Sequence, residues 1–357
     1  MSEITVGLGA RSYPIIIRSG ILENIGAELK KRKIAKRYAV ISDDRVAQLF
    51  GKTLMDSLDR EGLDSELITF AHGEANKNLA TVGALASALA SKGFDRKDGI
   101  IGFGGGVAGD IAGFVASSYM RGVEFVQVPT TLLAQVDSSV GGKTGVDIPE
   151  GKNLVGAFYQ PKGVFIDSLV LKTLPEQELL GGLAEVIKYG VIRDREFFDF
   201  LVHNRERILQ LDPAVMEKTI ATCCLIKADV VAEDEREGDV RRILNYGHTI
   251  GHAVEGASNY TIIHGLAVSI GMAAAARLAC LKGVLPEGDR DRIVRALDDY
   301  GLPTSVPAEL DRSLIKKYLL TDKKVVGGKV HYVLPTAIGD TVISADVTEQ
   351  QIDIVLG

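Results

Sequence analysis

The sequence contains no tryptophan and only three cysteines in 357 residues. The cysteines are Cys223, Cys224 and Cys280, and an odd set with two adjacent members excludes a disulfide framework. The N-terminal segment also lacks the apolar run of a secretory signal. We therefore expect a protein of a reducing compartment, the cytoplasm.

An excess of positive charge is missing as well. Lys and Arg number 41 and Asp and Glu number 47, so the formal net charge is −6. This balance does not suit a protein that tracks nucleic-acid phosphates or an anionic membrane surface, and we expect neither partner. The longest stretch without a charged residue, 256–276, contains Asn259, Tyr260, Thr261 and His264 and is too polar for a membrane span. The remaining class is a folded globular chain, since 46% of the residues are hydrophobic and 25% are charged.

The first half of the chain alternates strand-like and helix-like segments. This β-α-β alternation is typical of a parallel sheet with helices on both faces. The strands end near residue 165, and the segment 172–175 reads as a linker whose Pro175 opens a helix. After an opening hairpin, the pattern predicts helices over 21–31, 45–60 and 79–91 and strands over 38–42, 66–70 and 99–103.

From residue 176 onward the periodicity is helical. We therefore predict an α/β, Rossmann-like N-terminal domain, residues 1–172, followed by a mostly α-helical domain, residues 173–357. A cleft between two such domains is where we expect ligands to bind. The predicted helices of the second domain cover 192–209, 214–231, 244–257, 264–281 and 289–298, and short strands are predicted near 329–334 and 340–343.

A glycine-rich loop follows the predicted strand 99–103. Gly104, Gly106 and Gly109 have the spacing G-x-G-x-x-G before a helix of small residues, so backbone N–H groups at a helix start could cradle a phosphate. The loop follows a late strand, whereas the dinucleotide fingerprint follows the first one. A tight turn that allows close helix–sheet packing is the alternative interpretation.

Three of the six histidines fall within seventeen residues: His248, His252 and His264. His248 and His252 are one helical turn apart, and His264 opens the next predicted helix. Two histidines and one carboxylate are typical of an open catalytic zinc site. Glu185 is the best carboxylate donor, because it lies in an apolar, glycine-led helix, and the missing Glu of H-E-x-x-H disfavours a metalloprotease. Satisfied core or helix-cap histidines are the alternative.

Several cations lie among glycines and small residues, where a solvated face is not expected. They are Arg121, Lys143 and Lys152, the last beside Asn153. Together they indicate a polyanionic substrate, although each one alone could be a solvated or paired side chain. The segment 141–144 resembles the end of a Walker A loop but lacks its first glycine, which disfavours a nucleoside triphosphatase.

Ten short blocks are spread in order along almost the whole chain. They are 104–110 (GGGVAGD), 119–122 (YMRG), 128–133 (VPTTLL), 136–139 (VDSS), 141–144 (GGKT), 151–153 (GKN), 156–161 (GAFYQP), 184–188 (AEVIK), 245–252 (NYGHTIGH) and 322–324 (DKK). With these blocks the chain resembles the 3-dehydroquinate synthase family, which acts in the shikimate pathway and belongs to the sugar-phosphate cyclases. One departure is Leu266, where relatives often carry Glu beside a metal ligand.

The resemblance implies an enzyme, a carbon–oxygen lyase that eliminates phosphate, with bound NAD and one divalent metal, Zn²⁺ or Co²⁺. It implies metal ligation by Glu185, His248 and His264, and a homodimer in which Arg121 reaches the substrate phosphate of the neighbouring subunit. The implied NAD contacts are Asp43, Glu74, Lys77, Gly104, Gly105, Gly106, Gly109, Asp110, Thr130, Thr131, Lys143, Lys152 and Thr173. The implied substrate contacts are Arg121, Asp137, Lys143, Lys152, Asn153, Lys188, Lys227, Arg241, Asn245, His252 and Lys324, with Lys323 the alternative to Lys324. Catalytic roles are implied for His252, Lys143, Lys152, Asn153, Lys188, Arg241 and Asn245.

The implied reaction converts 3-deoxy-D-arabino-heptulosonate 7-phosphate into 3-dehydroquinate and phosphate. It proceeds by transient oxidation with NAD, β-elimination of phosphate, re-reduction and intramolecular aldol closure. Two other enzyme classes remain open, a metal- and NAD-dependent polyol dehydrogenase of the glycerol type and another sugar-phosphate cyclase such as an inosose or valiolone synthase. Arg241, Asn245 and Lys324 suit a substrate carboxylate and argue against another sugar-phosphate cyclase. A non-enzymatic module is the weakest interpretation.

Overall fold

The computed structural model describes residues 2–321, 325–326 and 329–357, and the chain forms two compact units. Unit 1 comprises residues 1–174 and 216–232, and unit 2 comprises residues 175–215 and 233–357. The expected boundary after residue 172 falls close to the observed one, but the expected division differs at helix α9 (Pro213–Glu233), most of which belongs to unit 1. Helix α9 belongs with unit 1 because it packs there: the Cys224 thiol on α9 donates to the Gln135 carbonyl oxygen at 3.3 Å.

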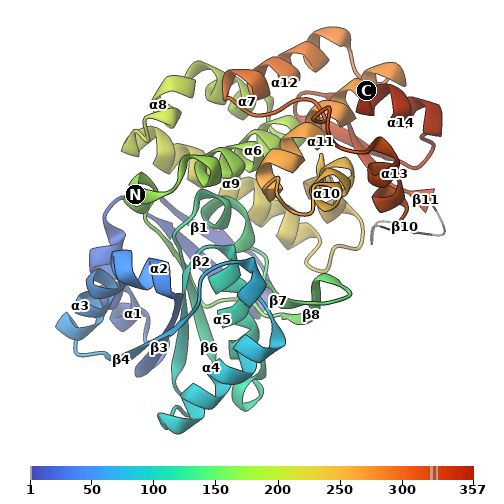
Figure 1. Ribbon diagram of the computed structural model, residues 1–357. Helices are drawn as coiled ribbons and strands as arrows, with labels where there is room; N and C mark the ends of the chain where they lie inside the picture. Colours follow the sequence, from blue (N-terminus) through green and yellow to red (C-terminus); the bar gives the residue numbers. More distant parts are fainter. Residues whose placement is uncertain (1, 322–324, 327–328) are drawn as a thin grey trace. The chain divides into compact units, whose positions relative to one another are not determined.

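Unit 1 is built on a seven-stranded sheet with the order β1-β2-β9-β6-β5-β3-β4 (Figure 1). The opening hairpin pairs β1 (Ser2–Val6) with β2 (Tyr13–Ile17), and all further pairings in this sheet are parallel. The predicted parallel sheet is therefore confirmed. Its other strands are β3 (Arg37–Asp43), β4 (Asp64–Phe70), β5 (Gly99–Gly104), β6 (Glu124–Pro129) and β9 (Val164–Ile166).

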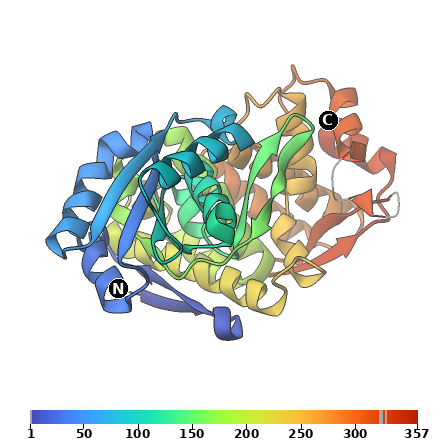
Figure 2. The same cartoon turned by 90° about the horizontal axis from the view of Figure 1, so that it is seen from below.

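Both faces of this sheet are covered, which explains why the central strand β5 is buried at every position. Alternate residues of β3 point to opposite layers: Val40 packs with α1 (Ile25–Arg32) and α3 (Lys52–Arg60), whereas Ile41 packs with α4 (Leu79–Ser91) and α5 (Gly106–Ser118). Figure 2 shows these layers from below. The predicted helix over 45–60 is present in three successive pieces, α2 (Asp44–Val46), the π-helix η3 (Ala47–Gly51) and α3.

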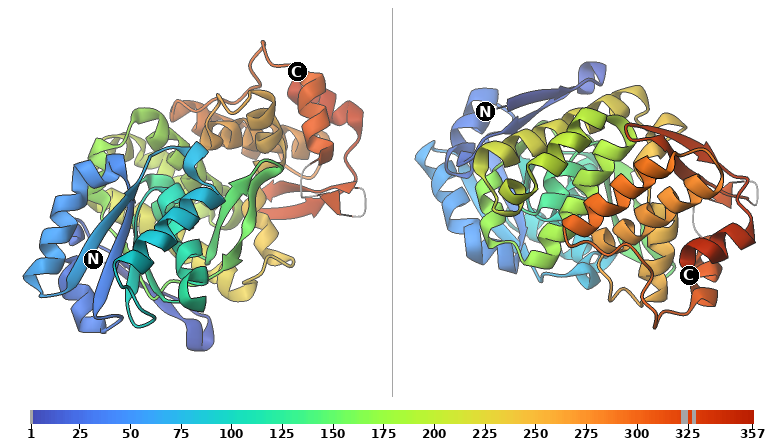
Figure 3. Two further views of the ribbon diagram at one scale, coloured as in Figure 1. Left: turned by 60° about the horizontal axis from the view of Figure 1, so that its bottom comes forward. Right: turned by 90° about the horizontal axis from the view of Figure 1, so that it is seen from above.

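A separate hairpin of unit 1 pairs β7 (Lys143–Ile148) with β8 (Gly151–Phe158), drawn in green in Figure 3. The sequence analysis does not predict these two strands. Glycines at 145, 151 and 156 interrupt the apolar alternation on which strand prediction depends. Two of these glycines are required, because a Cβ on Gly145 or Gly156 would lie within 2.7 Å of the facing strand's backbone.

Unit 2 is mostly helical, as predicted. Helix α6 (Glu176–Arg193) begins directly after Pro175, and α11 (His264–Leu281) has the predicted bounds. The prediction of a single helix over 192–209 is wrong. Asp194 has an extended backbone that ends α6, and its side chain accepts a hydrogen bond from the Phe197 amide, which caps the start of a new helix. The other elements are α7 (Arg195–His203), α8 (Arg205–Leu209), η8 (Val240–Asn245), α10 (His248–Ala257), α12 (Glu287–Asp299), α13 (Arg312–Thr321), β10 (Val325–Val326), β11 (Lys329–Val330), β12 (Tyr332–Ala337), β13 (Asp340–Ser344) and α14 (Glu349–Leu356).

Helix α11 is the core helix of unit 2. By length and composition it could cross a membrane, with a mean hydropathy of 1.4, but 72% of it is buried inside the structure. It packs against α6, α10 and α12.

Glycines set the spacing of α6, α10 and α11. A Cβ added to Gly271 of α11 would lie 1.9 Å from the carbonyl oxygen of Gly247, which precedes α10. A Cβ on Gly265 of α11 would lie 2.2 Å from the carbonyl oxygen of Gly181 in α6. Backbones that approach this closely bring the side chains beside them within contact distance.

We expect Gly271→Ala to destabilise unit 2 by about 1–3 kcal/mol, because the new methyl group must push α10 and α11 apart. Thermal unfolding measures the change. The matched control is Gly83→Ala in α4, where an added Cβ meets nothing within 4 Å. We expect that variant to be neutral or more stable by about 0.4–1 kcal/mol. An unchanged unfolding temperature in Gly271→Ala would contradict the close approach.

Candidate functional site

The three predicted histidines lie together in unit 2. His248 is the first residue of α10 and follows Gly247, whose φ of 79° favours glycine, while His264 is the first residue of α11. The ring of His248 lies 5.3 Å from those of His252 and His264 between centroids. One ring nitrogen from each of the three lies within 4.8 Å of the others. The structure therefore brings together the first residues of α10 and α11.

The carboxylate of Glu185 completes this group. Glu185 lies in α6 and is 0% exposed. Its Oε1 lies 3.5 Å from His248 Nε2 and 3.8 Å from His264 Nε2, and its Oε2 contacts Lys188 Nζ. Among the described residues, no hydrogen-bond donor reaches Oε1. Because buried carboxylate oxygens are normally satisfied, this position between two imidazole nitrogens suits a cation.

Hydrogen bonds fix which nitrogen of each imidazole faces Glu185. His248 Nδ1 lies 3.1 Å from the Tyr246 carbonyl oxygen and His264 Nδ1 lies 3.1 Å from Glu255 Oε2. Both oxygens can only accept, so each Nδ1 carries a proton and each Nε2 presents its lone pair toward Glu185. Burial opposes the charged form of His264, but the hydrogen bond to Glu255 and the charge of Glu185 raise its pKa.

Glu255 is a residue of this site that the sequence analysis misses. It lies in α10 and is 6% exposed. A carboxylate that holds the outer nitrogen of a metal-binding histidine is a recurrent feature of metal centres. The signal is present in the sequence, because Glu255 follows His248 and His252 at the helical spacing of seven and three residues.

The donor set of Glu185, His248 and His264, which we call the metal group, fits a divalent transition metal. Two imidazole nitrogens and one carboxylate oxygen are ligands that zinc takes in catalytic sites with an open position. His252 also offers a ring nitrogen within 4.8 Å of those of His248 and His264, but unlike them it is exposed. Its accessible ring suits proton transfer beside the metal group.

Two predicted substrate residues, Arg241 and Asn245, lie in η8, the 3-10 helix that comes shortly before His248 in the chain. Arg241 is only 2% exposed, and its Nη1 donates to the Glu235 carbonyl at 2.6 Å. Asn245 Nδ2 donates to Glu237 Oε1 at 2.9 Å. Glu237 could not be predicted from the sequence, because it lies in an irregular segment with a φ of 61°, where no periodicity signals it.

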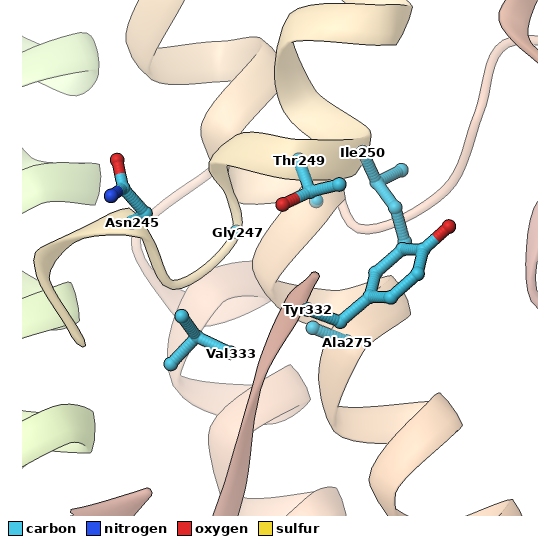
Figure 4. Close-up of a pocket in the computed structure, with 8 residues that line it drawn as sticks. Asn245, Gly247, Thr249, Ile250, Ala275, Tyr332 and Val333 are labelled. Carbon is cyan, nitrogen blue, oxygen red and sulfur yellow. The ribbon is translucent and has the colours of Figure 1, made fainter. Parts of the chain in front are cut away.

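A small pocket lies beside α10 (Figure 4). It is formed by Gly247, Thr249 and Ile250 on one side and by Tyr332 and Val333 of β12 on the other. None of its lining residues is charged. The pocket therefore does not match the polyanionic substrate expected from the sequence, and it forms part of the packing beneath α10.

The glycine-rich loop of unit 1 lies at the switch point of the sheet. After β4 the chain returns to the other side of β3 to form β5, so the order reverses between β3 and β5. A ligand of an open α/β sheet binds at such a point, at the carboxyl ends of the strands. Asp43 ends β3 and Gly104 ends β5, and a Cβ on Gly104 would lie 3.2 Å from Asp43 Oδ2. This topology explains why the loop follows a late strand.

Most predicted NAD residues gather around this loop. The Thr130 amide donates to the Gly104 carbonyl at 2.9 Å, and a Cβ on Gly105 would lie 3.0 Å from Thr131. Lys77 Nζ lies 2.7 Å from Asp110 Oδ2 in the first turns of α5. Burial opposes the charge of Lys77, but Asp110 and Glu74 raise its pKa. Thr173 lies in the 3-10 helix η7 (Ser168–Thr173), where its hydroxyl donates to Val170.

The predicted cationic residues of unit 1 lie on several elements. Lys227 Nζ on α9 donates to Asp137 Oδ1 at 2.5 Å, so the structure pairs two predicted substrate residues. Lys143, Lys152 and Asn153 lie on the β7–β8 hairpin. Arg121 ends the exposed turn η5 (Tyr119–Arg121). Lys323 and Lys324 lie outside the described residues.

The fold and the site define a class of proteins in which a nucleotide-binding type of α/β unit precedes a helical unit with a histidine–carboxylate group. Comparison with known families identifies the particular family within this class. The model of the 3-dehydroquinate synthase N-terminal region matches residues 67–181, and that of the C-terminal region matches residues 182–325. The chain belongs to the 3-dehydroquinate synthase family, and the resemblance in the sequence is confirmed.

Curated relatives and solved structures agree over the full length. A 3-dehydroquinate synthase of Desulforamulus reducens is 49% identical, covering 100% of this chain and 99% of the relative, and one of Thermodesulfovibrio yellowstonii is 46% identical with the same coverage. A solved 2-deoxy-scyllo-inosose synthase, in complex with carbaglucose-6-phosphate, NAD⁺ and Co²⁺, has a TM-score of 0.92 and 28% identity, covering 99% of both chains. A 2-epi-5-epi-valiolone synthase of Streptomyces hygroscopicus, with NAD⁺ and Zn²⁺ bound, has a TM-score of 0.89 and 30% identity, covering 98% of this chain and 97% of that chain.

We expect Glu255→Ala to lower the affinity for Zn²⁺ about 10- to 100-fold, because it removes the carboxylate that orients His264. Glu255→Gln keeps an acceptor and should lose less. His264→Ala should lose more, because it removes a ligand. Competition with a chromophoric chelator measures all three affinities.

The control for this series is His252→Ala. That histidine lies in the same cluster but outside the metal group, so its loss should leave the Zn²⁺ affinity nearly unchanged. Equal losses in His252→Ala and His264→Ala would contradict the ligand set.

Proposed function

We propose that the protein acts as a 3-dehydroquinate synthase, converting 3-deoxy-D-arabino-heptulosonate 7-phosphate into 3-dehydroquinate and inorganic phosphate in the shikimate pathway. One observation carries the proposal. The buried Glu185 Oε1 has no hydrogen-bond donor among the described residues and faces the Nε2 atoms of His248 and His264. Full-length relatives with this name, up to 49% identical, support the choice of reaction.

The proposed reaction has no net redox change. Carbon 5 loses a hydride and its hydroxyl proton, phosphate leaves by β-elimination, carbon 5 regains the hydride, and the opened ring closes by aldol addition. When bound, NAD⁺ supplies the hydride acceptor and Zn²⁺ or Co²⁺ supplies a Lewis acid for the substrate hydroxyls. The end of the sheet at Asp43 and Gly104 would hold NAD⁺, and the metal group would hold the metal ion.

The remaining predicted residues bind and orient an anionic substrate. Lys143, Lys152, Lys227 and Arg241 offer positive charge for its phosphate and carboxylate, and guanidinium groups suit such anions well. His252 is exposed beside the metal group and can take or return a proton at its ring nitrogen. Asp137, Asn153, Asn245 and Lys188 complete the proposed substrate contacts, and Lys324 is retained as a sequence-based member.

Two alternative enzyme classes are less well supported. A probable glycerol dehydrogenase of Sinorhizobium meliloti has a TM-score of 0.68 but 16% identity, which indicates a shared fold alone. The solved inosose and valiolone synthases are 28% and 30% identical, below the 49% of the named relative. Arg241 and Asn245 favour a substrate with a carboxylate.

The proposed chemistry predicts phosphate release without accumulation of NADH. The protein would be incubated with Zn²⁺, NAD⁺ and the heptulosonate phosphate, and released phosphate and NADH absorbance would be followed together. We expect one phosphate per substrate and no lasting NADH signal. His264→Ala is the inactive control. NADH formed one for one with substrate consumed would favour the polyol dehydrogenase instead.

We further propose that the active form is a homodimer in which Arg121 serves the neighbouring subunit. Arg121 and Met120 both have a positive φ, of 67° and 49°, on an exposed turn. Such strained backbone persists where the position of a side chain matters. A cytoplasmic location is also proposed, because Cys223, Cys224 and Cys280 form no disulfide with one another.

The dimer proposal predicts that two inactive chains complement each other. A chain with Arg121→Ala would be mixed with a chain with His248→Ala, and the mixed dimer would be isolated through two different affinity tags. One of its two sites then combines an intact metal group with an intact arginine, so activity should return. An inactive but verified mixed dimer would show that Arg121 serves its own subunit.

A further inference from the structure

The β7–β8 hairpin of unit 1 has an irregular register at the residues expected to bind substrate. Val146 pairs with Val155 and Ile148 pairs with Gly151, so Asp147 alone lies opposite Lys152, Asn153 and Leu154. Extra residues on one strand form a β-bulge, and bulges commonly redirect side chains next to functional sites. The bulge of β8 therefore determines where Lys152 and Asn153 point.

Asp147 closes this bulge with its side chain. The amide of Asn153, which lies in the bulge, donates to Asp147 Oδ1 at 2.7 Å. Asn153 has a φ of 54°, in the left-handed region. This carboxylate contact therefore supports a left-handed backbone conformation, which among residues other than glycine is adopted most readily by Asn and Asp.

The backbone of Asp147 joins the hairpin to the loop that carries Glu74 and Lys77. The Asp147 amide donates to the Lys77 carbonyl at 2.8 Å, and Asp147 forms an isolated parallel bridge with Asn78. The same lysine also reaches the bulge with its side chain, since Lys77 Nζ donates to Asn153 Oδ1 at 2.6 Å.

Lys77 connects this arrangement to the glycine-rich loop. Its ammonium is shared between Asn153 of the bulge and Asp110 of α5, 2.7 Å away, and Lys77 is 5% exposed. Burial raises the pKa of Glu74 while the charges of Lys77 and Lys152 oppose that rise, which places these groups in one electrostatic cluster. The residues expected to bind the cofactor and those expected to bind the substrate are therefore linked within unit 1.

We propose that Asp147 is a positioning residue: its carboxylate holds the bulge of β8, so that Lys152 and Asn153 meet the substrate while anchored to the cofactor loop through Lys77. The proposal rests on the proposed function. It also predicts a local structural effect that does not depend on activity.

Three variants separate this role from a loss of charge. Asp147→Ala removes the acceptor for the Asn153 amide, and Asp147→Asn keeps an acceptor oxygen without the charge. Glu150→Ala removes an equivalent charge from the exposed tip of the same hairpin. If Asp147→Ala does not fold, Asp147→Leu removes the acceptor while retaining the side-chain size.

The first measurement is steady-state phosphate release. We expect kcat/KM to fall about 10- to 100-fold in Asp147→Ala, mostly through KM, because a small displacement of binding groups has effects of this size. The kcat/KM of Asp147→Asn and Glu150→Ala should stay within about 3-fold of the wild-type value, because both variants retain an acceptor for the Asn153 amide. The NAD⁺ dissociation constant should change less than KM, because Lys152 is only one of the implied cofactor contacts and the glycine-rich loop is intact.

The second measurement is amide hydrogen exchange, which needs no substrate. Exchange over 151–155 should accelerate in Asp147→Ala and remain near wild type in Asp147→Asn and Glu150→Ala. A wild-type protein that releases no phosphate would reject the proposed function but leave this prediction intact. Unchanged exchange in Asp147→Ala, or equal losses in Asp147→Ala and Asp147→Asn, would overturn the positioning role.

Discussion

Unit 2 depends on one constraint, a carboxylate with no exposed surface. Removing Glu185 from water is costly unless its charge is compensated, and Lys188 on the same helix compensates one of its oxygens. The other oxygen faces His248 and His264 on two other helices, where a bound cation would compensate it. The helices α6, α10 and α11 must therefore cross with their backbones nearly in contact, and this is why glycines lie at the crossings. The tight packing of unit 2 and its metal chemistry have the same cause.

Unit 1 meets a different requirement, because its expected cofactor residues lie at the ends of two neighbouring strands. The reversal of strand order between β3 and β5 leaves the ends of two strands without a covering connection. A loop without side chains at Gly104–Gly106 exposes N–H groups there, and α5 begins within the same loop. Lys77, paired with Asp110 beside that loop, places a cation at the same edge. The site is thus a consequence of topology first and of charge second.

The parts of the site that could be predicted from the sequence are those fixed by local geometry. His248 and His252 share a helix face whatever the rest of the chain does, and His264 was recognisable as a helix start. Glu185 stood out because a charge in an apolar helix is unusual. Glu255 has the same helical signal, at seven and three residues from the two histidines of α10. Asp147 and the bulge of β8 could not be predicted, because register depends on which strand pairs with which. The break at Asp194 was missed because a capping side chain competes with a continuous apolar period.

The pairing of the cations bears on the choice of substrate. Lys227 lies against Asp137 and Lys188 against Glu185, each with its ammonium group buried. Withdrawing such a lysine from its carboxylate costs several kcal/mol unless another anion replaces the partner. A neutral polyol offers no replacement and would gain nothing from these lysines. In the proposed function, a substrate that carries a phosphate and a carboxylate would share the ammonium groups with the resident carboxylates, so each charge pair would favour a polyanion over a polyol.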